Sequence, residues 1–404
     1  MNVLHIIHSL DPRSGGPSHA LYGLVRAQSE IGHSVSVIAT DRQSGEPWEE
    51  PEGFLEQVKS YLPPHLCQLT VIPSYGRKNL WLRYGYSPVC RRMLRQSLSQ
   101  AKSSAKPDFV HVHGVFSQIT QLATQICRKK GIPYALRPTG ALNPITLNKG
   151  ARLWKKLFAH LLLETSLNQA AFVHATSAQE AASLRSHDWG NNIRVIPLGI
   201  RPPRWEPKHY QNIFAELFPK LSGKKFILCL SRIHPIKRLD LALLSFAEFE
   251  KNHPGYHLVI AGDPTDYQVR LQQLVIELQI IDQVHFIGFL DGEPKSGAFF
   301  SAEAFLQTSE HENFGMTVME ALAHGLSVIC TKGVASGSHV EALQGGRRTD
   351  DTPSAITEAM ETVLSMPTSA RNKVLANMVS RRFSWNEIAT NLDTHMLPHI
   401  NLTS

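Results

Sequence analysis

Short apolar, β-rich runs alternate with longer segments of helical spacing along most of the chain. Segments such as Ser18–Glu30 and Ile119–Lys129 place apolar residues at helical intervals between these runs. Strands that alternate with helices pair in parallel through crossover helices, so the pattern predicts an α/β fold. The strands predicted in the first half are Val3–His8, Val35–Ala39, Leu69–Ile72, Phe109–His113, Tyr134–Leu136, Phe172–Ala175 and Val195–Leu198.

A proline-rich segment interrupts the alternation near the middle of the chain. Ile200–Pro207 reads IRPPRWEP, and its three prolines indicate a linker. The chain of 404 residues suits two domains of about 150–200 residues each. Two α/β halves joined by this linker are therefore the simplest architecture. The strands predicted in the second half are Phe226–Leu230, His257–Ala261, His285–Phe289, Ala304–Gln307 and Ser327–Cys330.

The stretch Arg381–Ile400 carries the signals of a terminal helix. Ser384 has Glu387 three residues later, which is the spacing of a capping box. Phe383 before the cap and Ile388 after it suit a hydrophobic staple. We expect a helix here that docks on another part of the protein.

The charge balance narrows the class of partner. The net charge is +7 and the isoelectric point is about 9.1, which favours nucleotide phosphates, an anionic membrane surface or nucleic acid. Zinc-finger spacing, RNP-like stretches and long Lys/Arg runs are missing from the sequence, so no nucleic acid is expected. A mildly basic globular protein without an anionic partner is the alternative. Disorder is not expected, because 42% of the residues are hydrophobic and only 19% are charged.

Cysteine usage and the N-terminus predict a cytosolic protein. The five cysteines are far apart and odd in number, and no C-x-x-C pair occurs among them. Cys127, Cys229 and Cys330 lie in apolar stretches, where a thiol behaves as a small hydrophobe. The first apolar run has no basic region before it and is too short for a signal peptide. No apolar stretch is long enough to span a membrane.

Two glutamates lie around the start of a predicted helix in the second half. The segment Glu310–Gly325 reads EHENFGMTVMEALAHG and follows the predicted strand AFLQTS. A helix that begins near Gly315–Thr317 would direct its free amides out of the carboxyl edge of the sheet, which favours an anion there. Glu312 and Glu320 are poor phosphate ligands, so we expect them to face the hydroxyls of sugar and ribose rings. The alternative is that both are solvated charges at a helix end.

Two cations follow the first strand of the second half. Phe226–Leu230 runs directly into SRIHPIKR, which places Arg232 and Lys237 five residues apart. At the carboxyl end of a strand, this pair could clamp a diphosphate and neutralise the charge on a leaving group. As isolated features they would be ordinary surface cations. Their combination with Glu312 and Glu320 favours a binding site over isolated surface charges.

Three features of the first half also lie where strands end. The turn Ser14–Ser18 reads SGGPS, and its glycines allow the backbone to approach a phosphate, although a plain turn remains open. His111 and His113 share one face of a strand, and their spacing suggests a metal, but no third ligand has convincing spacing. A hydrogen-bonded histidine at the strand end is therefore preferred. Arg137 follows the next strand, where a structural role and contact with a substrate are both open.

These motifs resemble the GT4 family of retaining glycosyltransferases. Glu312 and Glu320 match its E-x7-E motif, with N-F-G and E-A-x-A-x-G text around them, and Arg232 and Lys237 match its R-x4-K pair. The resemblance covers nearly the whole chain. The text from Arg137 to Leu163 is similar to a bacterial subgroup linked to cell-surface polysaccharide assembly. The segment Lys332–Arg348 departs from the acidic, glycine-rich loop of many relatives, so the edge of the donor pocket can differ.

The resemblance implies a GT-B fold, in which two Rossmann-like parallel-sheet domains face each other across a cleft. Residues 1–202 would form the acceptor-side domain and residues 203–380 the nucleotide-sugar donor domain. Residues 381–404 would form a helix that crosses back onto the first domain.

The resemblance also implies roles for residues. Glu320 would hold the ribose hydroxyls, Glu312 the transferred sugar, and His113 would contact that sugar near the reacting carbon, with Arg137 on the acceptor side. His113, Glu312, Arg232 and Lys237 are the candidates for catalysis. Val284–Leu290 resembles the segment that flanks the base. The residues expected at the donor are Gly15, Gly16, Arg232, Lys237, Phe286, Gly288, Glu312, Asn313, Phe314, Gly315, Met316, Thr317 and Glu320.

The expected reaction is transfer of a sugar from a UDP- or GDP-linked donor to a hydroxyl acceptor, with retained configuration. No cofactor is expected, and because no D-x-D motif occurs we predict metal independence. Tyr75–Arg95 and Lys149–Leu163 mix Trp81, Tyr84 and Trp154 with cations, which suits a lipid-linked acceptor and contact with the inner face of the plasma membrane. A solvated helix face is the alternative for both stretches. A nucleotide-sugar epimerase and a non-catalytic binding partner are the competing functions.

Overall fold

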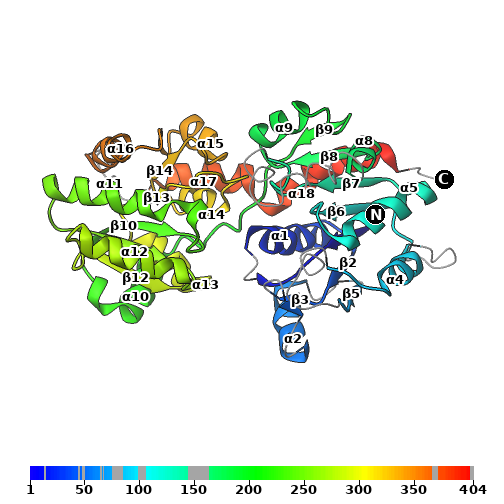
Figure 1. Ribbon diagram of the computed structural model, residues 1–404, viewed down its shortest axis with the longest axis horizontal. Coiled ribbons are helices and arrows are strands. Elements are labelled where there is room, and N and C mark those ends of the chain that lie inside the picture. Colours follow the sequence, from blue (N-terminus) through cyan, green and yellow to red (C-terminus); the bar gives the residue numbers. More distant parts are fainter. Residues whose placement is uncertain are drawn as a thin grey trace. The chain divides into compact units, whose positions relative to one another are not determined.

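A computed structural model of the chain describes residues 1–12, 15–43, 46–47, 51–63, 66, 68–74, 85–98, 106–143, 163–365 and 372–400. The chain divides into two compact units (Figure 1). Unit 1 comprises Met1–Gly199 together with Trp385–Ser404, and unit 2 comprises Ile200–Ser384. Each unit has a parallel sheet with helices on its faces, which confirms the predicted α/β class.

Unit 1 contains a seven-stranded parallel sheet of order β5-β2-β1-β6-β7-β8-β9. The strands are β1 (Asn2–Ile7), β2 (Ser34–Thr40), β5 (Gln68–Ile72), β6 (Phe109–His113), β7 (Tyr134–Arg137), β8 (Phe172–Ala175) and β9 (Ile193–Val195). A short antiparallel pair, β3 (Arg42–Gln43) and β4 (Glu46–Pro47), follows β2. The prediction of a strand at Val195–Leu198 is wrong, because β9 ends where that run begins. The amide of Ile196 still donates to Ala175, but Pro197 has no N–H with which to extend the ladder.

Helices cover both faces of this sheet. They are α1 (Gly16–Glu30), α2 (Pro51–Tyr61), α4 (Cys90–Ser97), α5 (Gln118–Lys130), α8 (Glu164–Asn168), α9 (Ala178–Arg185) and α18 (Trp385–Met396), with the 3-10 turn η5 (Leu397–His399). On one face, Leu24 of α1 and Ile388 of α18 belong to the cluster that contains Val3 and Phe109. On the other face, Ile119 of α5 packs in the cluster that contains Val110. Alternate residues of β6 thus supply two separate cores.

The face under α1 changes character along its strands. Its apolar residues lie near the amino ends of the strands, and polar side chains follow them toward the carboxyl ends. The apolar set is Val3, Phe109, Ala135 and Phe172, and the polar set is His5, His111, His113, Arg137 and His174. All five polar side chains are buried, so the carboxyl half of this face is a polar layer inside the unit.

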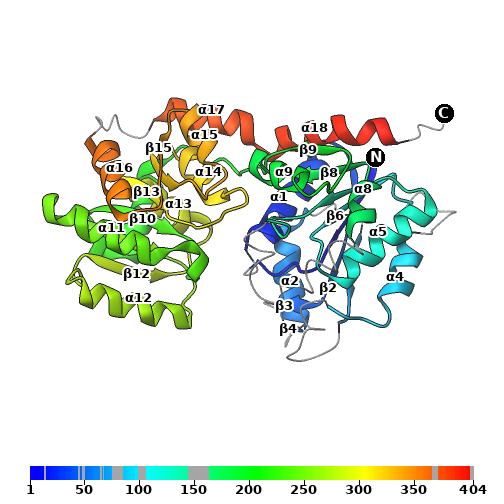
Figure 2. The same cartoon turned by 45° about the horizontal axis from the view of Figure 1, so that its top comes forward.

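Helix α18 completes unit 1 and lies along α1 (Figure 2). Trp385 packs against α1 at Gly23, where a Cβ would fall 2.1 Å from the indole ring. Further along the helix, His33 Nε2 lies 2.7 Å from an oxygen of Asp393. Residues Arg381–Phe383 belong to the preceding helix α17 (Lys373–Phe383), which lies in unit 2, and extended backbone at Ser384 separates the two helices.

Unit 2 contains a six-stranded parallel sheet of order β12-β11-β10-β13-β14-β15. The strands are β10 (Lys225–Leu230), β11 (Tyr256–Ala261), β12 (Val284–Gly288), β13 (Ala304–Gln307), β14 (Val328–Thr331) and β15 (Gly346–Thr349). The helices are α10 (Pro207–Leu217), α11 (Leu239–Asn252), α12 (Asp266–Glu277), α13 (Gly292–Ser301), α14 (Met316–Ala323), α15 (Gly337–Ala342) and α16 (Pro353–Ser365), with the 3-10 turns η3 (Pro219–Leu221) and η4 (Pro235–Lys237). The sequence did not predict β15, because its residues GRRT offer no apolar run.

Four of the five cysteines lie within the described residues. Cys90, Cys127, Cys229 and Cys330 are buried and free, and burial raises the pKa of each thiol to about 12. Cys67 lies outside the described residues. Within the described ranges, no helix combines the length and the apolar character that crossing a membrane requires.

Candidate active site

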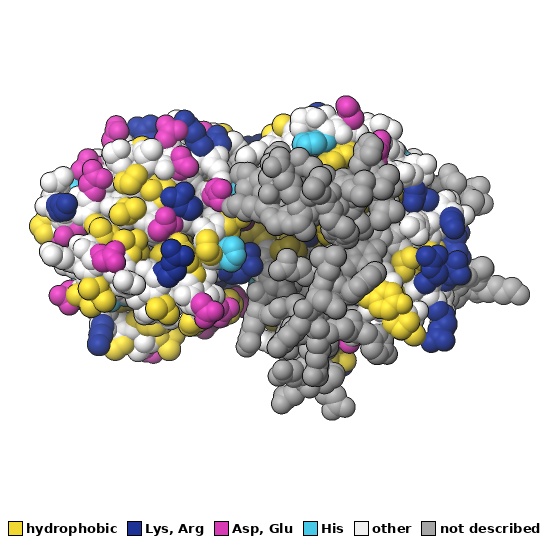
Figure 3. Space-filling model, viewed as in Figure 1, with side chains coloured by type: hydrophobic (Ala, Val, Ile, Leu, Met, Phe, Trp, Pro, Cys, Tyr) yellow, Lys and Arg dark blue, Asp and Glu magenta, His cyan; other side chains and the backbone are white. Residues whose placement is uncertain are grey.

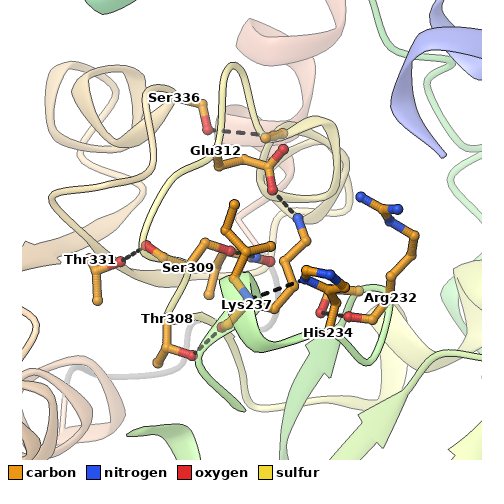
Figure 4. Close-up of polar contacts among 12 residues, drawn as sticks. Arg232, His234, Lys237, Thr308, Ser309, Glu312, Thr331 and Ser336 are labelled. Atoms are coloured by element: carbon orange, nitrogen blue, oxygen red, sulfur yellow. Dashed lines mark hydrogen bonds and ion pairs between the residues drawn. The ribbon is translucent and has the colours of Figure 1, made fainter. Parts of the chain in front are cut away.

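The loops at the carboxyl edge of the unit 2 sheet are tied to one another by hydrogen bonds. Thr308, just after β13, donates its hydroxyl to the carbonyl oxygens of Lys237 and Arg238, at 3.1 and 2.8 Å (Figure 4). Thr331, the last residue of β14, donates to the carbonyl oxygen of Ser309 at 2.8 Å. The amide of Glu310 donates to Ile236. The segment with the two cations and the segment with Glu312 are therefore held side by side.

Gly315 starts α14 in a conformation that only glycine adopts easily. Its φ is +87°, and a Cβ there would fall 2.8 Å from Ser336 Oγ and 3.2 Å from Val334 Cγ1. The amides of Gly315, Met316 and Thr317 have no hydrogen-bond partner among the described residues. These N–H groups form the positive end of the α14 dipole, at the place where an anion site is expected from the sequence.

The segment that departs from the family pattern supports this turn. Glu312 donates its amide to Gly333 and accepts from the amide of Ala335 through its carbonyl oxygen. The amide of Ser336 donates to the carbonyl of Phe314, whose buried ring lies edge-on to that of His339. The stretch Lys332–Arg348 therefore forms one wall of the motif loop. Its different sequence can change the surroundings of Glu312 without changing the motif itself.

Lys237 and Glu312 form an ion pair across the two loops (Figure 4). Their side chains are 13% and 24% exposed, so the pair is largely removed from water. The sequence assigned Lys237 to a diphosphate and Glu312 to sugar hydroxyls, and it did not predict that they contact each other. Because Lys237 has three N–H donors, it can keep Glu312 and contact a phosphate oxygen at the same time.

Arg232 lies just beyond β10 and is exposed. It forms no ion pair with any residue in the described ranges, and in Figure 4 its side chain extends on the same side of the loop as that of Lys237. Because no carboxylate among the described residues pairs with Arg232, the N–H donors of its planar guanidinium can bind a ligand.

Glu320 is paired with a lysine that the sequence analysis missed. Lys295 of α13 places its Nζ 2.8 Å from Glu320 Oε1, and the two side chains are 22% and 19% exposed. Glu320 Oε2 is buried and accepts no hydrogen bond from the described residues. One carboxylate oxygen is thus fixed by a cation, and the other remains available as an acceptor. No sequence signal linked these residues, because they lie 25 positions apart on different helices.

The remaining predicted donor residues lie along the same edge of the sheet. Met316 and Thr317 are half-buried in the first turn of α14, and Asn313 is half-buried before it. Phe286 and Gly288 belong to β12, the edge strand, which β11 and β10 separate from β13. Gly288 has a φ of +79° and accepts the amide of Gly262. Two strands therefore lie between β12, which holds Phe286 and Gly288, and the strand that precedes Glu312.

In unit 1, the predicted glycine turn caps α1. Gly15 is the N-cap, with φ +89° and ψ −149°, which is a region open to glycine alone. Gly16 is exposed, and a Cβ there would meet nothing within 4 Å. The backbone requirement therefore falls on Gly15, whereas Gly16 leaves open space at the start of the helix. Ser14 lies outside the described residues.

Arg137 ends β7 as a fully buried cation. One Nη donates to the carbonyl of Pro17 at 3.4 Å, while Nε and the other Nη have no hydrogen-bond partner in the described part of the chain. Burial lowers the pKa of the guanidinium to about 10, which still leaves it charged at neutral pH. A buried donor without a partner costs about 1–3 kcal/mol, so the burial of Arg137 destabilises the folded state.

His113 ends β6 and belongs to a buried cluster of four histidines. His113 Nε2 lies 2.9 Å from His5 Nδ1, and His5 Nε2 lies 2.6 Å from Gln28 Oε1. His111 Nε2 lies 3.2 Å from His174 Nδ1, and His174 Nε2 lies 2.8 Å from the carbonyl oxygen of Ile196. Burial lowers the pKa of all four imidazoles, and the nearby Arg137 lowers it further. The cluster is therefore neutral at pH 7.

The sequence found no third ligand to join His111 and His113, but the fold supplies one. His5, His111 and His113 offer nitrogen atoms that all lie within 4.8 Å of one another. This arrangement comes from the parallel register, which sets His5 of β1 beside His111 of β6. A His-x-His pattern can be read from sequence, whereas the neighbour of a strand cannot. The cationic Arg137 beside the cluster opposes a metal ion there.

Two family models match most of the chain. The model described as a glycosyl transferase 4-like domain matches residues 15–199, and the model described as glycosyl transferases group 1 matches residues 212–378. The chain belongs to the GT4-type glycosyltransferases. This confirms the family that the two motif pairs predicted. Both pairs lie within the group 1 match, and the His113 cluster lies largely within the other.

Two relatives of this glycosyltransferase align with the chain over part of their length. It is 36% identical over 140 residues to the alpha-monoglucosyldiacylglycerol synthase of Streptococcus pneumoniae, which is 34% of this chain and 32% of that protein. It is 26% identical over 203 residues to the glycogen synthase of Mycobacterium tuberculosis, which is 49% of this chain and 46% of that protein. The chain thus spans about a third to a half of the length of these relatives.

The fold of the glycosyltransferase is that of solved GT-B enzymes. The structure of Anabaena HepE in complex with UDP and glucose matches with a TM-score of 0.73 and 17% sequence identity, over 98% of this chain and 100% of that one. At this identity the likeness concerns the fold alone. It confirms the predicted GT-B class with two Rossmann-like parallel sheets.

Proposed function

We propose that this glycosyltransferase moves a sugar from a nucleoside-diphosphate donor to a hydroxyl acceptor and retains the anomeric configuration. The observation that carries the proposal is the grouping at the carboxyl edge of the unit 2 sheet. Two cations, two carboxylates and three amides without a partner among the described residues lie there, on loops joined by hydrogen bonds and on the helix α14 that follows one of them. Cations and amides suit the diphosphate, while carboxylates suit the hydroxyls of a sugar and a ribose.

The cations and amides act on the leaving group. Arg232 would grip the diphosphate with its forked donors, and Lys237 would contribute a point charge while it holds Glu312. When the bond from the sugar to the diphosphate breaks, negative charge grows on the leaving oxygen, and fixed positive groups stabilise that charge. These protein groups neutralise the diphosphate directly, so the proposal includes transfer without a metal ion.

The carboxylates orient the donor. Glu320 would accept from the ribose hydroxyls, with Lys295 fixing its orientation, and Glu312 would accept from a hydroxyl of the transferred sugar. His113 would contact the same sugar near the reacting carbon. The chemistry is front-face departure of the diphosphate and attack by the acceptor, so that positioning and charge stabilisation supply the rate.

The donor proposal is a UDP- or GDP-linked sugar. HepE, one of the structural neighbours, was solved in complex with UDP and glucose, which makes UDP-sugars the first donors to test. Buried, free cysteines support a reducing compartment, so we include a cytosolic location in the proposal.

A basic surface on unit 1 supports a lipid-linked acceptor. Figure 3 shows Lys and Arg side chains gathered on the part of unit 1 where α4 and α5 lie. The exposed cations there are Arg91, Arg92, Arg95, Lys129 and Lys130, and neither helix contains an acidic residue. Such a surface attracts anionic lipid, which would bring the enzyme to glycolipid or polysaccharide precursors. Trp81, Tyr84 and Trp154 of the two basic and aromatic stretches lie outside the described residues.

Thermal shift across a set of UDP- and GDP-sugars, followed by measurement of sugar transfer and donor hydrolysis, tests the proposal. We expect one donor to raise the unfolding temperature, and we expect Glu320→Ala to abolish its binding. The matched control is Glu358→Ala, which removes an exposed carboxylate on α16 of the same unit. Unchanged donor affinity in Glu320→Ala would contradict the assignment. Release of free nucleotide without any acceptor would indicate an epimerase, and donor binding without turnover a non-catalytic partner.

A further inference from the structure

The two histidine pairs of unit 1 each end on an oxygen that can only accept. His174 Nε2 faces the backbone carbonyl of Ile196, so this nitrogen carries the proton and donates it. In a neutral imidazole the other nitrogen is then an acceptor, so His174 Nδ1 receives the N–H of His111 Nε2. His111 is therefore protonated on Nε2 and has a lone pair on Nδ1.

The same reasoning applies to the pair that contains His113. Gln28 presents its amide oxygen to His5 Nε2 at 2.6 Å, so His5 donates there and has its lone pair on Nδ1. That lone pair lies 2.9 Å from His113 Nε2, which must carry a proton in order to donate. His113 is thereby held in the tautomer with its lone pair on Nδ1, as the hydrogen bond at one nitrogen decides the proton at the other.

The lone pair on His113 receives no hydrogen bond from the described residues. His113 Nδ1 is buried and has no hydrogen-bond partner among the described residues, and the same holds for Nε and one Nη of Arg137. His113 and Arg137 are cross-strand neighbours at the carboxyl ends of β6 and β7, on the same face of the sheet. An acceptor beside cationic donors fits a hydroxyl, which can donate to the imidazole and accept from the guanidinium.

We propose that His5, oriented by Gln28, is a positioning residue that fixes the His113 tautomer so that Nδ1 accepts a hydrogen bond from a hydroxyl of the donor sugar. This inference rests on the proposed function, because it requires a sugar at His113. His5 does not contact the substrate and acts only through His113. A purely structural role for His5 would leave the tautomer of His113 unconstrained.

Nuclear magnetic resonance of histidine-selectively ¹⁵N-labelled protein reads the tautomer directly. In the wild-type protein we expect His113 to be protonated on Nε2, and the Nδ1 resonance to shift when the donor selected by thermal shift is added. His5→Leu removes the acceptor, so we expect a mixture of tautomers at His113. His5→Asn keeps an oxygen near the position of Nδ1 and should restore the Nε2–H form. His174→Asn is a buried control that belongs to the other pair and should leave the His113 tautomer unchanged.

Kinetics of the same variants separate positioning from folding. We expect His5→Leu to lower kcat by about tenfold, the smaller of the effects known for partners that orient metal-bound histidines, while the Kd for UDP stays unchanged. His5→Asn should recover most of the rate. Wild-type protonation on Nδ1, or a wild-type kcat in His5→Leu, would overturn the inference and leave the proposed function intact. A wild-type protein that binds no nucleotide sugar would overturn both.

A metal centre predicts a different result in the same spectra. Addition of Zn²⁺ alone would then shift ring nitrogens of His5, His111 and His113 together and would break the bond between His5 and His113. We expect no such change, because Arg137 places a positive charge beside the cluster. A joint shift at stoichiometric Zn²⁺ would replace the positioning role with a metal site.

Discussion

Lys237 and Glu312 form an ion pair that joins the loop after β10 to the loop after β13. Lys237 belongs to the proposed diphosphate contact and Glu312 to the proposed sugar contact. Substitution of each residue should therefore impair a different step. We expect Lys237→Met to weaken UDP binding and to lower kcat/KM by about a hundredfold, because a stabilising charge near the leaving group is lost. We expect Glu312→Gln to bind UDP normally and to lose sugar transfer. Calorimetric titration with UDP and steady-state kinetics measure the two effects.

A control for this prediction is available on the surface of unit 2. Lys332 pairs with Asp350 at 2.6 Å, but its side chain is 64% exposed. Lys332 is the first residue of the wall beside the motif loop, but that wall contacts Glu312 through the backbone of Gly333 and Ala335. Lys332→Met removes only an exposed side chain and its ion pair, so UDP binding and turnover should both persist. Equal losses of UDP affinity in Lys237→Met and Glu312→Gln would show that the pair serves only to hold the loops together.

Lys295 fixes one oxygen of Glu320, and we expect its loss to affect binding of the donor more than turnover. A contact to the ribose is the same in the ground state and the transition state, so its loss raises KM and spares kcat. Lys295→Met should therefore raise the KM for the donor several-fold. The sharper measurement compares UDP with 2′-deoxy-UDP. If Glu320 binds the 2′-hydroxyl, removal of this hydroxyl should cost less affinity in Lys295→Met than in the wild type. Equal costs in both proteins would contradict the link.

The motif loops of unit 2 could be predicted because each signal is local. A strand, a polar loop and a helix start lie within Ala304–Ala323, and the glycine that the turn requires is part of the motif. The carboxyl edge of a parallel sheet then brings neighbouring loops together without further information. The same logic identified the strand that ends at His113.

What sequence could not supply was contact between elements that are distant along the chain. His5 reaches His113 only through the pairing of β1 with β6, a separation of 108 residues, and Lys295 reaches Glu320 from a different helix. Edge elements were also missed. The strand β15, with the sequence GRRT, lies at the edge of its sheet and pairs on only one side with a strand in the described part of the chain, so it needs no apolar run. Pro197 ended β9 earlier than its apolar neighbours indicated.

Gly315 should tolerate no side chain, for two separable reasons. Its φ of +87° strains any other residue, at about 1–3 kcal/mol, and a Cβ would also crowd Ser336 Oγ at 2.8 Å. Gly255 has a φ of +95° with nothing within 4 Å of a Cβ, so Gly255→Ala measures the backbone strain alone. We expect Gly315→Ala to lower the urea midpoint of unfolding more than Gly255→Ala does. Equal shifts of the midpoint would mean that the segment Lys332–Arg348 moves away from the added Cβ without a loss of stability.

Buried neutral histidines should make unit 1 sensitive to acid. Burial lowers the pKa of His5 to about 4 and that of His174 to about 3, whereas an unfolded chain binds these protons near pH 6.5. The unfolded state therefore binds more protons below pH 6.5, and stability is full above that value and falls as the pH drops toward 4. His5 alone contributes a loss on the order of 3 kcal/mol across this window.

Urea unfolding at pH 7, 6 and 5 tests this sensitivity through differences between variants, because carboxylates add their own dependence on pH. His5→Asn and His174→Asn each remove a group that titrates only in the unfolded chain, so the free energy of unfolding should fall less steeply with acid than in the wild type. His187→Asn changes an exposed histidine and should keep the wild-type slope. If all three variants lose stability between pH 7 and pH 5 as the wild type does, the cluster is not held neutral by the fold.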